Sequence, residues 1–503
     1  MSTETELTGS PYHGPFDLIL AGGQVVDGTG VARRLADVGI LGDRIAAVGD
    51  LAAMPAASRR DASGLIVAPG FIDTHTHDDN ALLAWPEMPY KVSQGVTTTV
   101  VGNCGVSLAP LAPSRELPRP LDLIADAPDY RFRRFRDYLD ALDADPPAVN
   151  AAALAGHTTL RAGAVGSLDR AAARDEIRAM AIGLEEALEA GAIGLSTGLY
   201  YDTARAAPTS EVVALAHVVA RFGGLYTTHL RDEGARVAEA IREAFTIGRE
   251  ARVPVVISHF KVAGRANYGR SRETLALIEE ARRVQPVAID AYPYTAGATE
   301  LSMDRVVTAD RVLVTWSKPM PEMAGRDLHA LAGEWSVPVE EAVRRLHPAG
   351  AIYFQMDEAD VRRILSWPET MIGSDGLPRD THPHPRLWGT FPRVLGRYSR
   401  DLGLFSLEEA VRHMTSIPAE RFGLAGRGVL RQGAFADLVV FDPARIADRA
   451  TFEAPIAPAA GIELVMVNGR AVWEGGGHTG ARPGRALRRA DLDAPMRGLG
   501  WAS

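Results

Sequence analysis

The sequence predicts an α/β protein built on a TIM-like (β/α)8 barrel, with a small β-sandwich made from both chain ends and an insertion before the last barrel strand. Two observations support this. The middle of the chain alternates short apolar stretches with amphipathic helices, as βα units do. Eight of the apolar stretches end in polar residues. Because a barrel builds its active site at the C-terminal ends of its strands, we expect these polar ends to meet in one site.

The predicted barrel strands are the segments 65–77, 96–104, 149–157, 192–197, 225–229, 253–259, 287–292 and 369–375. The clearest predicted helices are 171–190, 211–222, 235–252 and 273–283. In the last of these, Leu275, Ile278 and Ala281 fall on one side and charged residues on the other, which is typical of a helix that covers a core.

The two flanks of the chain have a different pattern. Residues 16–51 and 430–475 form short strand-like runs broken by turns, with Asn468-Gly469 as an expected hairpin turn. We expect them to pair into one sandwich, with parts at 16–64 and 426–482, around a barrel at 65–425. Residues 1–15 are expected to be a flexible N-terminus and 483–503 a C-terminal tail.

The gap between the seventh and eighth predicted strands is far longer than a crossover requires. We therefore expect an insertion at about 301–351, on the active-site side of the barrel. It is either a lid or specificity cap, or a helical excursion without a role.

Composition limits the class of protein. The 503 residues include 54 Lys+Arg and 63 Asp+Glu, a net charge of −9, with 46% hydrophobic and 23% charged residues. This is the profile of an ordinary soluble protein, and without a basic stripe it argues against nucleic acid as a partner. No run is long and apolar enough for a membrane span, and residues 1–15 lack a secretory pattern. The composition therefore predicts a cytoplasmic protein. We also expect a small-molecule substrate as the partner, and the sequence leaves a homo-oligomer open.

The end of the first predicted strand carries the motif His75-Thr76-His77. Alternate side chains of a strand share a face, so both imidazoles are expected to point into the barrel mouth. Other strand ends supply further ligand-type residues, namely Cys104, His229, His259 and Asp375. An isolated pair of histidines is weak evidence, but the whole set at one rim predicts a metal centre.

Cys104 is the only cysteine, so an intramolecular disulfide is impossible. A single cysteine is commonly a small buried hydrophobe, and a Cys-His nucleophile pair is a further alternative. We favour a metal ligand, because the nucleophile would leave His75, His77 and Asp375 without roles. A thiolate with two imidazoles leaves the fourth position of zinc open, as hydrolysis requires.

The complete set of motifs resembles a known family. PGFIDTHTHDD, GVTTTVVGNCG, TTHLRDEG, ISHFK, DAYPYTAG and IGSDG with HPHPRLWGTFPR are similar to the N-acyl-D-amino-acid deacylases, or D-aminoacylases, of the amidohydrolase superfamily. The resemblance covers roughly residues 16–480. Many members of the superfamily bridge two metals with a carboxylated lysine on strand 4, where this sequence reads AIGLSTGLYYD. Cys104 is then the expected substitute for that lysine.

The resemblance implies a role for each residue of the set. Cys104, His229 and His259 would hold one tight Zn²⁺, and His75 and His77 would share Cys104 in a second, weaker site. Asp375 would act as general base and then as general acid.

Substrate binding falls to residues beside this set. The family implies that Lys261, one of only three lysines, and Tyr292 bind the α-carboxylate. Tyr294 lies two residues further on and is expected to share the face of Tyr292. Arg386 would bind an acidic side chain of the substrate, or it has only a structural role.

Three classes of function remain open. The favoured one is zinc-dependent hydrolysis of an N-acyl-D-amino acid to a carboxylate and a free D-amino acid. The alternatives are a cyclic-amide hydrolase of the hydantoinase or dihydroorotase kind, which usually relies on the lysine missing here, and a barrel kept as a binding module. The D configuration of the substrate rests on the resemblance alone.

Overall fold

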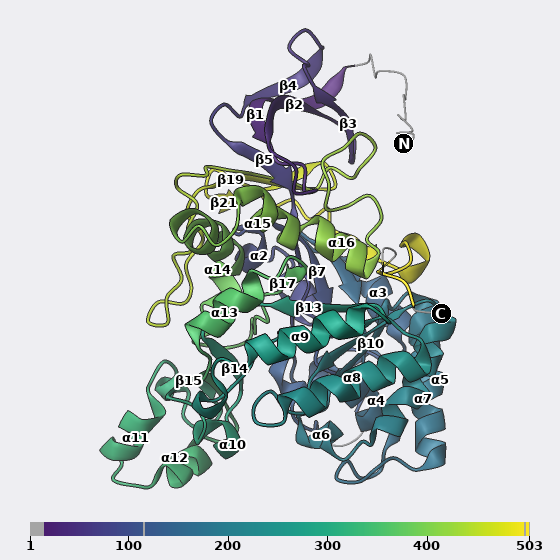
Figure 1. Cartoon of the computed structure of the whole chain (residues 1–503), viewed down its shortest axis with the longest axis vertical. Helices are drawn as coiled ribbons and strands as arrows, with labels where there is room; N and C mark the ends of the chain where they lie inside the picture. Colours follow the sequence, from purple (N-terminus) through teal and green to yellow (C-terminus); the bar gives the residue numbers. More distant parts are fainter. Residues whose placement is uncertain (1–14, 114–115, 497–498, 502–503) are drawn as a thin grey trace.

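The computed structural model describes residues 15–113, 116–496 and 499–501 (Figure 1). The predicted flexible N-terminus, apart from Pro15, lies outside the described residues. Within these residues, no helix is both long enough and apolar enough to cross a membrane.

Parallel strands form the centre of the molecule, in two sheets. One sheet has the order β22-β8-β7-β6 and the other β17-β13-β12-β11-β10-β9. Their bounds are β6 Phe71–Asp73, β7 Val96–Val101, β8 Asn150–Ala153, β9 Ala155–Gly156, β10 Gly194–Gly198, β11 Leu225–His229, β12 Val255–Ile257, β13 Val287–Ala291, β17 Thr370–Ile372 and β22 Ala486–Leu487. Ile193 donates a backbone hydrogen bond to Ala153 on one side of the gap between the sheets, and Thr74 donates to Ile372 on the other.

Helices α5, α7, α8 and α9 lie side by side along the parallel strands (Figure 1). They are the four predicted helices, with bounds Arg174–Ala190, Thr209–Arg221, Val237–Ala251 and Ser271–Arg282. The apolar side of α9 is buried, as its pattern predicts, with Ile278 fully inaccessible. Outside residues 296–354, the other α-helices of the described residues are α1 Ala81–Ala84, α2 Pro89–Val92, α3 Phe135–Ala144, α4 His157–Ala164, α6 Asp202–Arg205, α13 Glu358–Leu365, α14 Arg386–Arg393, α15 Leu407–Met414 and α16 Ser416–Phe422.

Both chain ends contribute to one nine-stranded sheet, of order β21-β20-β19-β18-β5-β1-β2-β3 with β4 paired to β1. Its strands are β1 Phe16–Val25, β2 Arg34–Leu41, β3 Arg44–Gly49, β4 Ala56–Asp61, β5 Ile66–Pro69, β18 Leu438–Phe441, β19 Ile462–Val467, β20 Arg470–Glu474 and β21 Gly477–His478. Antiparallel pairing of β5 with β18 joins the two ends. Asn468 and Gly469, with φ of 47° and 76°, form the predicted turn between β19 and β20.

The predicted first strand, 65–77, is wrong as a single strand. Its first part is β5 in the terminal sheet, and only β6 joins the parallel strands. The chain changes sheets at Gly70, where a Cβ atom would come within 2.3 Å of the Thr97 hydroxyl oxygen. The apolar run therefore continues from one sheet into the next, and the only sign of the boundary in the sequence is the glycine at position 70.

Two further predictions need correction. The segment 149–157 divides into β8 and β9, and its last residue, His157, begins α4 instead of ending a strand. Within the expected C-terminal tail, β22 pairs in parallel with β8, so part of the tail extends the sheet that contains β6, β7 and β8.

Residues 296–354 form a separate three-stranded antiparallel sheet of order β14-β16-β15, with three helices. The bounds are β14 Ala296–Glu300, α10 Met303–Val306, β15 Arg311–Ser317, α11 Leu328–Glu334, α12 Val339–Leu346 and β16 Ala349–Phe354. This unit has its own hydrophobic core and projects from the rest of the molecule, with α11 and α12 at its tip (Figure 1).

Candidate metal centre

Three of the predicted site residues have unusual backbone conformations. Cys104, His259 and Asp375 follow β7, β12 and β17 with φ of 54°, 36° and 50°. A positive φ is uncommon for residues other than glycine and persists only where the surrounding structure enforces it. Such residues gather at functional sites, and here the sharp turns bring three strand ends to one point.

Cys104, His229 and His259 converge on one position. The Cys104 Sγ lies 3.3 Å from His259 Nε2 and 3.7 Å from His229 Nδ1, and these two nitrogens are 3.0 Å apart. Three donor atoms at such separations surround a position suited to a single ion.

A second group adjoins the first. His75 Nε2 lies 3.3 Å from the Cys104 Sγ, and His77 Nε2 lies 3.2 Å from Asp375 Oδ1. The ligand atoms of His75, His77 and Asp375 all lie within 4.8 Å of one another. Cys104 therefore lies between the two groups, where a ligand shared by two ions would be.

The chemistry of the buried donors fits a metal. All six residues of the two groups are at most 7% exposed, and a thiolate with imidazoles is a typical zinc ligand set. Burial opposes ionisation of Cys104, but the charges of His75 and His259 and hydrogen bonds from the imidazoles hold its thiol pKa well below the usual range. Burial also lowers the pKa of His77, yet bonds to Asp375 and Cys104 raise it to about 9. The two anions thus favour positive charge between them, which a metal cation supplies.

Asp375 is paired on its other side with Arg386. The Arg386 Nη1 lies 2.8 Å from Asp375 Oδ2. Burial raises the pKa of Asp375, but Arg386 and the nearby histidines hold it well below the usual range. The carboxylate is therefore ionised at neutral pH and can accept a proton.

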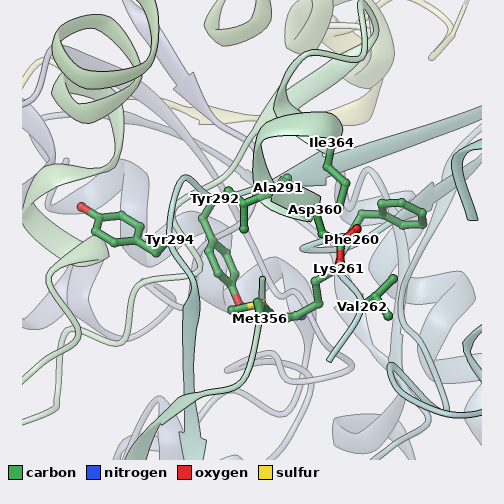
Figure 2. Close-up of a pocket in the computed structure, with 10 residues that line it drawn as sticks. Phe260, Lys261, Val262, Ala291, Tyr292, Tyr294, Met356, Asp360 and Ile364 are labelled. Atoms are coloured by element: carbon green, nitrogen blue, oxygen red, sulfur yellow. The ribbon is translucent and has the colours of Figure 1, made fainter. Parts of the chain in front are cut away.

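Lys261 and Tyr292 lie together beside the metal centre. Both line the small cavity of about 20 Å³ that also contains His77, His259 and Asp375. The Lys261 ammonium lies 5.6 Å from the centre of the Tyr292 ring, and the two side chains converge in Figure 2. Burial lowers the pKa of Lys261, but the Glu233 carboxylate raises it above the usual value, so the group carries a positive charge in a buried position.

Tyr294 does not point toward Lys261. Figure 2 shows its ring directed away from Tyr292, and its hydroxyl lies 3.5 Å from the Pro385 carbonyl. The expectation of a shared face assumed that the strand continues, whereas β13 ends at Ala291 and a turn joins Tyr294 N to Tyr292 O.

Arg386 is fully buried at the start of α14. Besides its ion pair with Asp375, it donates a hydrogen bond to the Ala298 carbonyl. In the structure Arg386 therefore contacts the predicted base. That it also binds an acidic side chain of the substrate stays a prediction.

Sequence reasoning missed three residues that support the site. The Glu233 carboxylate contacts both His259 and Lys261. Asp290 accepts a hydrogen bond from the His259 backbone. Lys91, which is fully buried, donates to Asp73 and Ser374. Glu233 and Asp290 stand within the quoted motifs, TTHLRDEG and DAYPYTAG, so their positions were an available signal, and the rarity of lysine was one for Lys91.

The sequence matches the model of the amidohydrolase family over residues 60–314 and 326–473. The chain therefore belongs to the amidohydrolase family and, within it, to the D-aminoacylases, which confirms the resemblance. It is 59% identical to the D-aminoacylase of Alcaligenes xylosoxydans xylosoxydans over 94% of this chain and 98% of that one.

Two solved structures are similar over 94% of this chain and 100% of their own. One is a D-aminoacylase with a binuclear metal centre, described by one-metal activation and second-metal attenuation, at 58% identity and a TM-score of 0.92. The other is the N-acyl-D-glutamate deacylase of Bordetella bronchiseptica with zinc and a phosphonate that mimics the tetrahedral intermediate, at 48% identity and a TM-score of 0.92.

Proposed function

We propose that this protein is a zinc-dependent deacylase that hydrolyses N-acyl-D-amino acids to a carboxylate and a free D-amino acid. The observation that carries the proposal is that His229 and His259, whose ring nitrogens meet the Cys104 sulfur, line one cavity with a buried base, Asp375, and a buried lysine, Lys261. The zinc-bound deacylase and the D-aminoacylase to which the chain is similar support the same reaction.

Cys104, His229 and His259 would hold the tight zinc, and His75 and His77 the weaker second ion. When bound, zinc lowers the pKa of a coordinated water toward neutrality and polarises the amide carbonyl. The binuclear centre of the similar D-aminoacylase supports a second site. Cys104, between the two groups, would contribute to both.

Asp375 is the proposed general base. Its Oδ1 faces the metal ligands, where it can accept the proton of the attacking water and return it to the leaving amine nitrogen. Arg386 holds the other oxygen, Oδ2, and so fixes the direction of the first.

Lys261 and Tyr292 would bind the α-carboxylate of the substrate. An ammonium in a buried cavity attracts a carboxylate more strongly than it would in water, because the surrounding dielectric is low. Arg386 lies 4.6 Å from the centre of the Tyr292 ring, so a positive charge approaches that tyrosine from a second side.

The parallel strands support an eight-stranded barrel that begins after Gly70, within the predicted 65–425, and in which hydrogen bonds from Thr74 to Ile372 bring β6 and β17 together. The terminal sheet supports a sandwich from both chain ends, in which β5 extends the first part beyond the predicted 16–64 to Pro69. The unit between β13 and β17 would be the insertion and act as a lid, since Gly297, Thr299 and Tyr353 line the cavity. At about 20 Å³ the cavity has room for about one water molecule, which supports a lid that opens when a substrate enters.

The test is an assay of free amine after incubation of the zinc-loaded protein with paired N-acetyl-D- and N-acetyl-L-amino acids. We expect hydrolysis of the D series, and cleavage of neither series would refute the proposal. Hydantoin and dihydroorotate in parallel reactions test the cyclic-amide alternative. Strand β10, which corresponds to the fourth predicted barrel strand at 192–197, has no lysine to bridge two metals and so disfavours that alternative. The predicted cytoplasmic location and homo-oligomer stay predictions.

A further inference from the structure

Glu233 lies in the loop between β11 and α8 and is 7% exposed. Its carboxylate contacts two of the proposed zinc ligands and the proposed substrate-binding lysine. Oxygen Oε1 lies 3.1 Å from His259 Nδ1 and 2.5 Å from Lys261 Nζ. Oxygen Oε2 lies 3.6 Å from His229 Nε2 and 3.6 Å from Arg305 Nη1. One buried carboxylate thus faces three groups that the proposed reaction uses.

The two histidines present their other nitrogens to the metal position. His259 turns Nε2, and His229 turns Nδ1, toward the Cys104 sulfur. A nitrogen that binds a metal carries no hydrogen, so each ring must then carry its hydrogen on the nitrogen that faces Glu233. A carboxylate in that position fixes the orientation and tautomer of metal-binding histidines.

The contact with His229 is incomplete in this structure. Both His229 Nε2 and Glu233 Oε2 are buried and have no hydrogen-bond partner. They face each other at 3.6 Å, and a small contraction would give the ~3.0 Å of an ordinary N–H···O bond. Two unpartnered polar atoms in such a position are suited to a hydrogen bond, which would form if a metal held the histidine by its other nitrogen.

The same carboxylate affects Lys261. The ammonium contacts three acceptors, Glu233 Oε1, the His259 carbonyl and His259 Nδ1, the last at 2.7 Å. An ammonium has three N–H groups, so these contacts use all of them. Once His259 Nδ1 carries a hydrogen for Glu233, it can no longer accept from Lys261, and one N–H group becomes available.

We infer that Glu233 is a positioning residue that couples metal binding to substrate binding. Glu233 orients His229 and His259 for the metal, and it holds Lys261 in place. When His259 binds the metal, its Nδ1 would no longer accept a hydrogen bond from Lys261, and one ammonium N–H would be left for the substrate carboxylate. The inference rests on the proposed function and adds to it a reason why the metal and the carboxylate site depend on each other.

The test compares Glu233→Gln with Asp232→Asn. Glutamine keeps the shape of Glu233 but removes its charge. Asp232 is a matched control, because it lies in the same loop and carries the same charge. Among the described residues it accepts hydrogen bonds from the Gly234 and Arg236 backbone, and its ion pair is with Arg236. Two quantities are measured for each variant: the zinc dissociation constant by competition with a chelator, and KM at saturating zinc for an N-acyl-D-amino acid and for its matched amide.

For Glu233→Gln we expect zinc affinity to fall about 10- to 100-fold, as for other lost partners of metal-binding histidines. At saturating zinc, KM should rise more for the acid than for the amide, because only the acid needs the oriented Lys261. Asp232→Asn should stay within about twofold of wild type in both quantities.

Unchanged zinc affinity in Glu233→Gln would overturn the inference, and so would weaker zinc binding with an unchanged ratio of acid to amide KM. If Glu233→Gln does not fold because Lys261 is left unpaired, the double variant with Lys261→Met removes that charge and should still bind zinc more weakly. If the wild-type protein hydrolyses no substrate, the proposed function fails, while the zinc titration still decides whether Glu233 orients the histidines.

Discussion

The two ends of the parallel strands both bury clusters of polar side chains, but they differ in how completely the polar atoms are paired. At the C-terminal ends, His75 Nδ1, His77 Nδ1 and His229 Nε2 are buried without a hydrogen-bond partner. At the N-terminal ends, a network connects Asn150, Arg427, Asp437 and Asn468, and within the described part of the chain none of their side-chain nitrogens and oxygens is buried without a hydrogen-bond partner.

This difference distinguishes two roles of buried polar side chains, the binding of a ligand and the stabilisation of the fold. An unpaired buried group lowers stability unless something else compensates for it, so a cluster of such groups indicates a ligand. A fully paired network has no capacity left for a ligand and instead fixes one structural element against another. This agrees with the division found in barrel proteins, where chemistry lies at the C-terminal face and the opposite face serves stability.

The largest effect is expected for Cys104→Ala, which removes the sulfur that lies between the two ligand groups. Wild-type protein should retain about one zinc per chain after dialysis, and the variant should lose both zinc and activity, because two imidazoles alone hold the ion weakly. Metal analysis and the amine assay on the same sample check this. A variant that stays zinc-loaded and active would show that Cys104 is not a ligand.

The next effect is that of Asp375→Asn, which keeps the shape of the base but cannot accept a proton. We expect kcat to fall about 10²- to 10⁴-fold while the tight zinc remains. Asp175→Asn, whose side chain is 87% exposed, is the control for loss of a carboxylate. If the variant keeps more than a tenth of wild-type kcat, the base is another group.

Lys261→Met tests the carboxylate contact with an apolar side chain of similar length. The variant removes one partner of a buried charge pair, so we expect kcat/KM for the free acid to fall about 30- to 4000-fold. The loss should be much smaller for the matched N-acyl amino amide, which has no carboxylate. Lys318→Met, at an exposed lysine, is the control. Equal losses on acid and amide would assign Lys261 to the support of the metal site.

Much of this architecture could be predicted from the sequence. The four helices were predicted to within three residues at each end, because a helix repeats its apolar side over many residues and the pattern averages out local exceptions. The gathering of Cys104, His229, His259 and Asp375 in one place was predicted because each lies at or just after the end of an apolar strand, and parallel strands end at the same edge. That these residues bind a metal stays a proposal.

The errors have a common physical origin. Where the chain leaves regular structure, spacing no longer fixes direction, which is why Tyr294 points away from Tyr292 after β13 ends. The sheet change at Gly70 depends on the absence of a side chain beside Thr97, a contact between distant segments. Glu233 was missed because it lies in the loop that follows β11, where the strand pattern no longer predicts that its carboxylate reaches the histidines.

The turn at Asn468, in the network at the N-terminal ends of the strands, also shows that contacts between distant segments could not be predicted from the sequence. The sequence predicted its conformation but not its burial: the side chain is 5% exposed and donates to Asn150. It also accepts from Arg427, which forms an ion pair with Asp437. Asp437 in turn accepts a hydrogen bond from the Asn468 backbone. The network therefore ties the turn between β19 and β20 to the start of β8.

The smallest effect on activity, and the sharpest contrast with the metal centre, is expected for Asp437→Asn. The change keeps the shape but leaves the Arg427 guanidinium buried without its counter-charge, which should destabilise the protein by about 3–5 kcal/mol. The melting temperature should therefore fall clearly below that of wild type and of the Asp175→Asn control. Zinc content and kcat at 25 °C should stay unchanged, because none of the hydrogen bonds or ion pairs that the described residues form in this network involves a proposed zinc ligand. A loss of zinc or of kcat in folded Asp437→Asn would show that the two ends of the strands are coupled, and the separation of chemistry from stability would not hold for this protein.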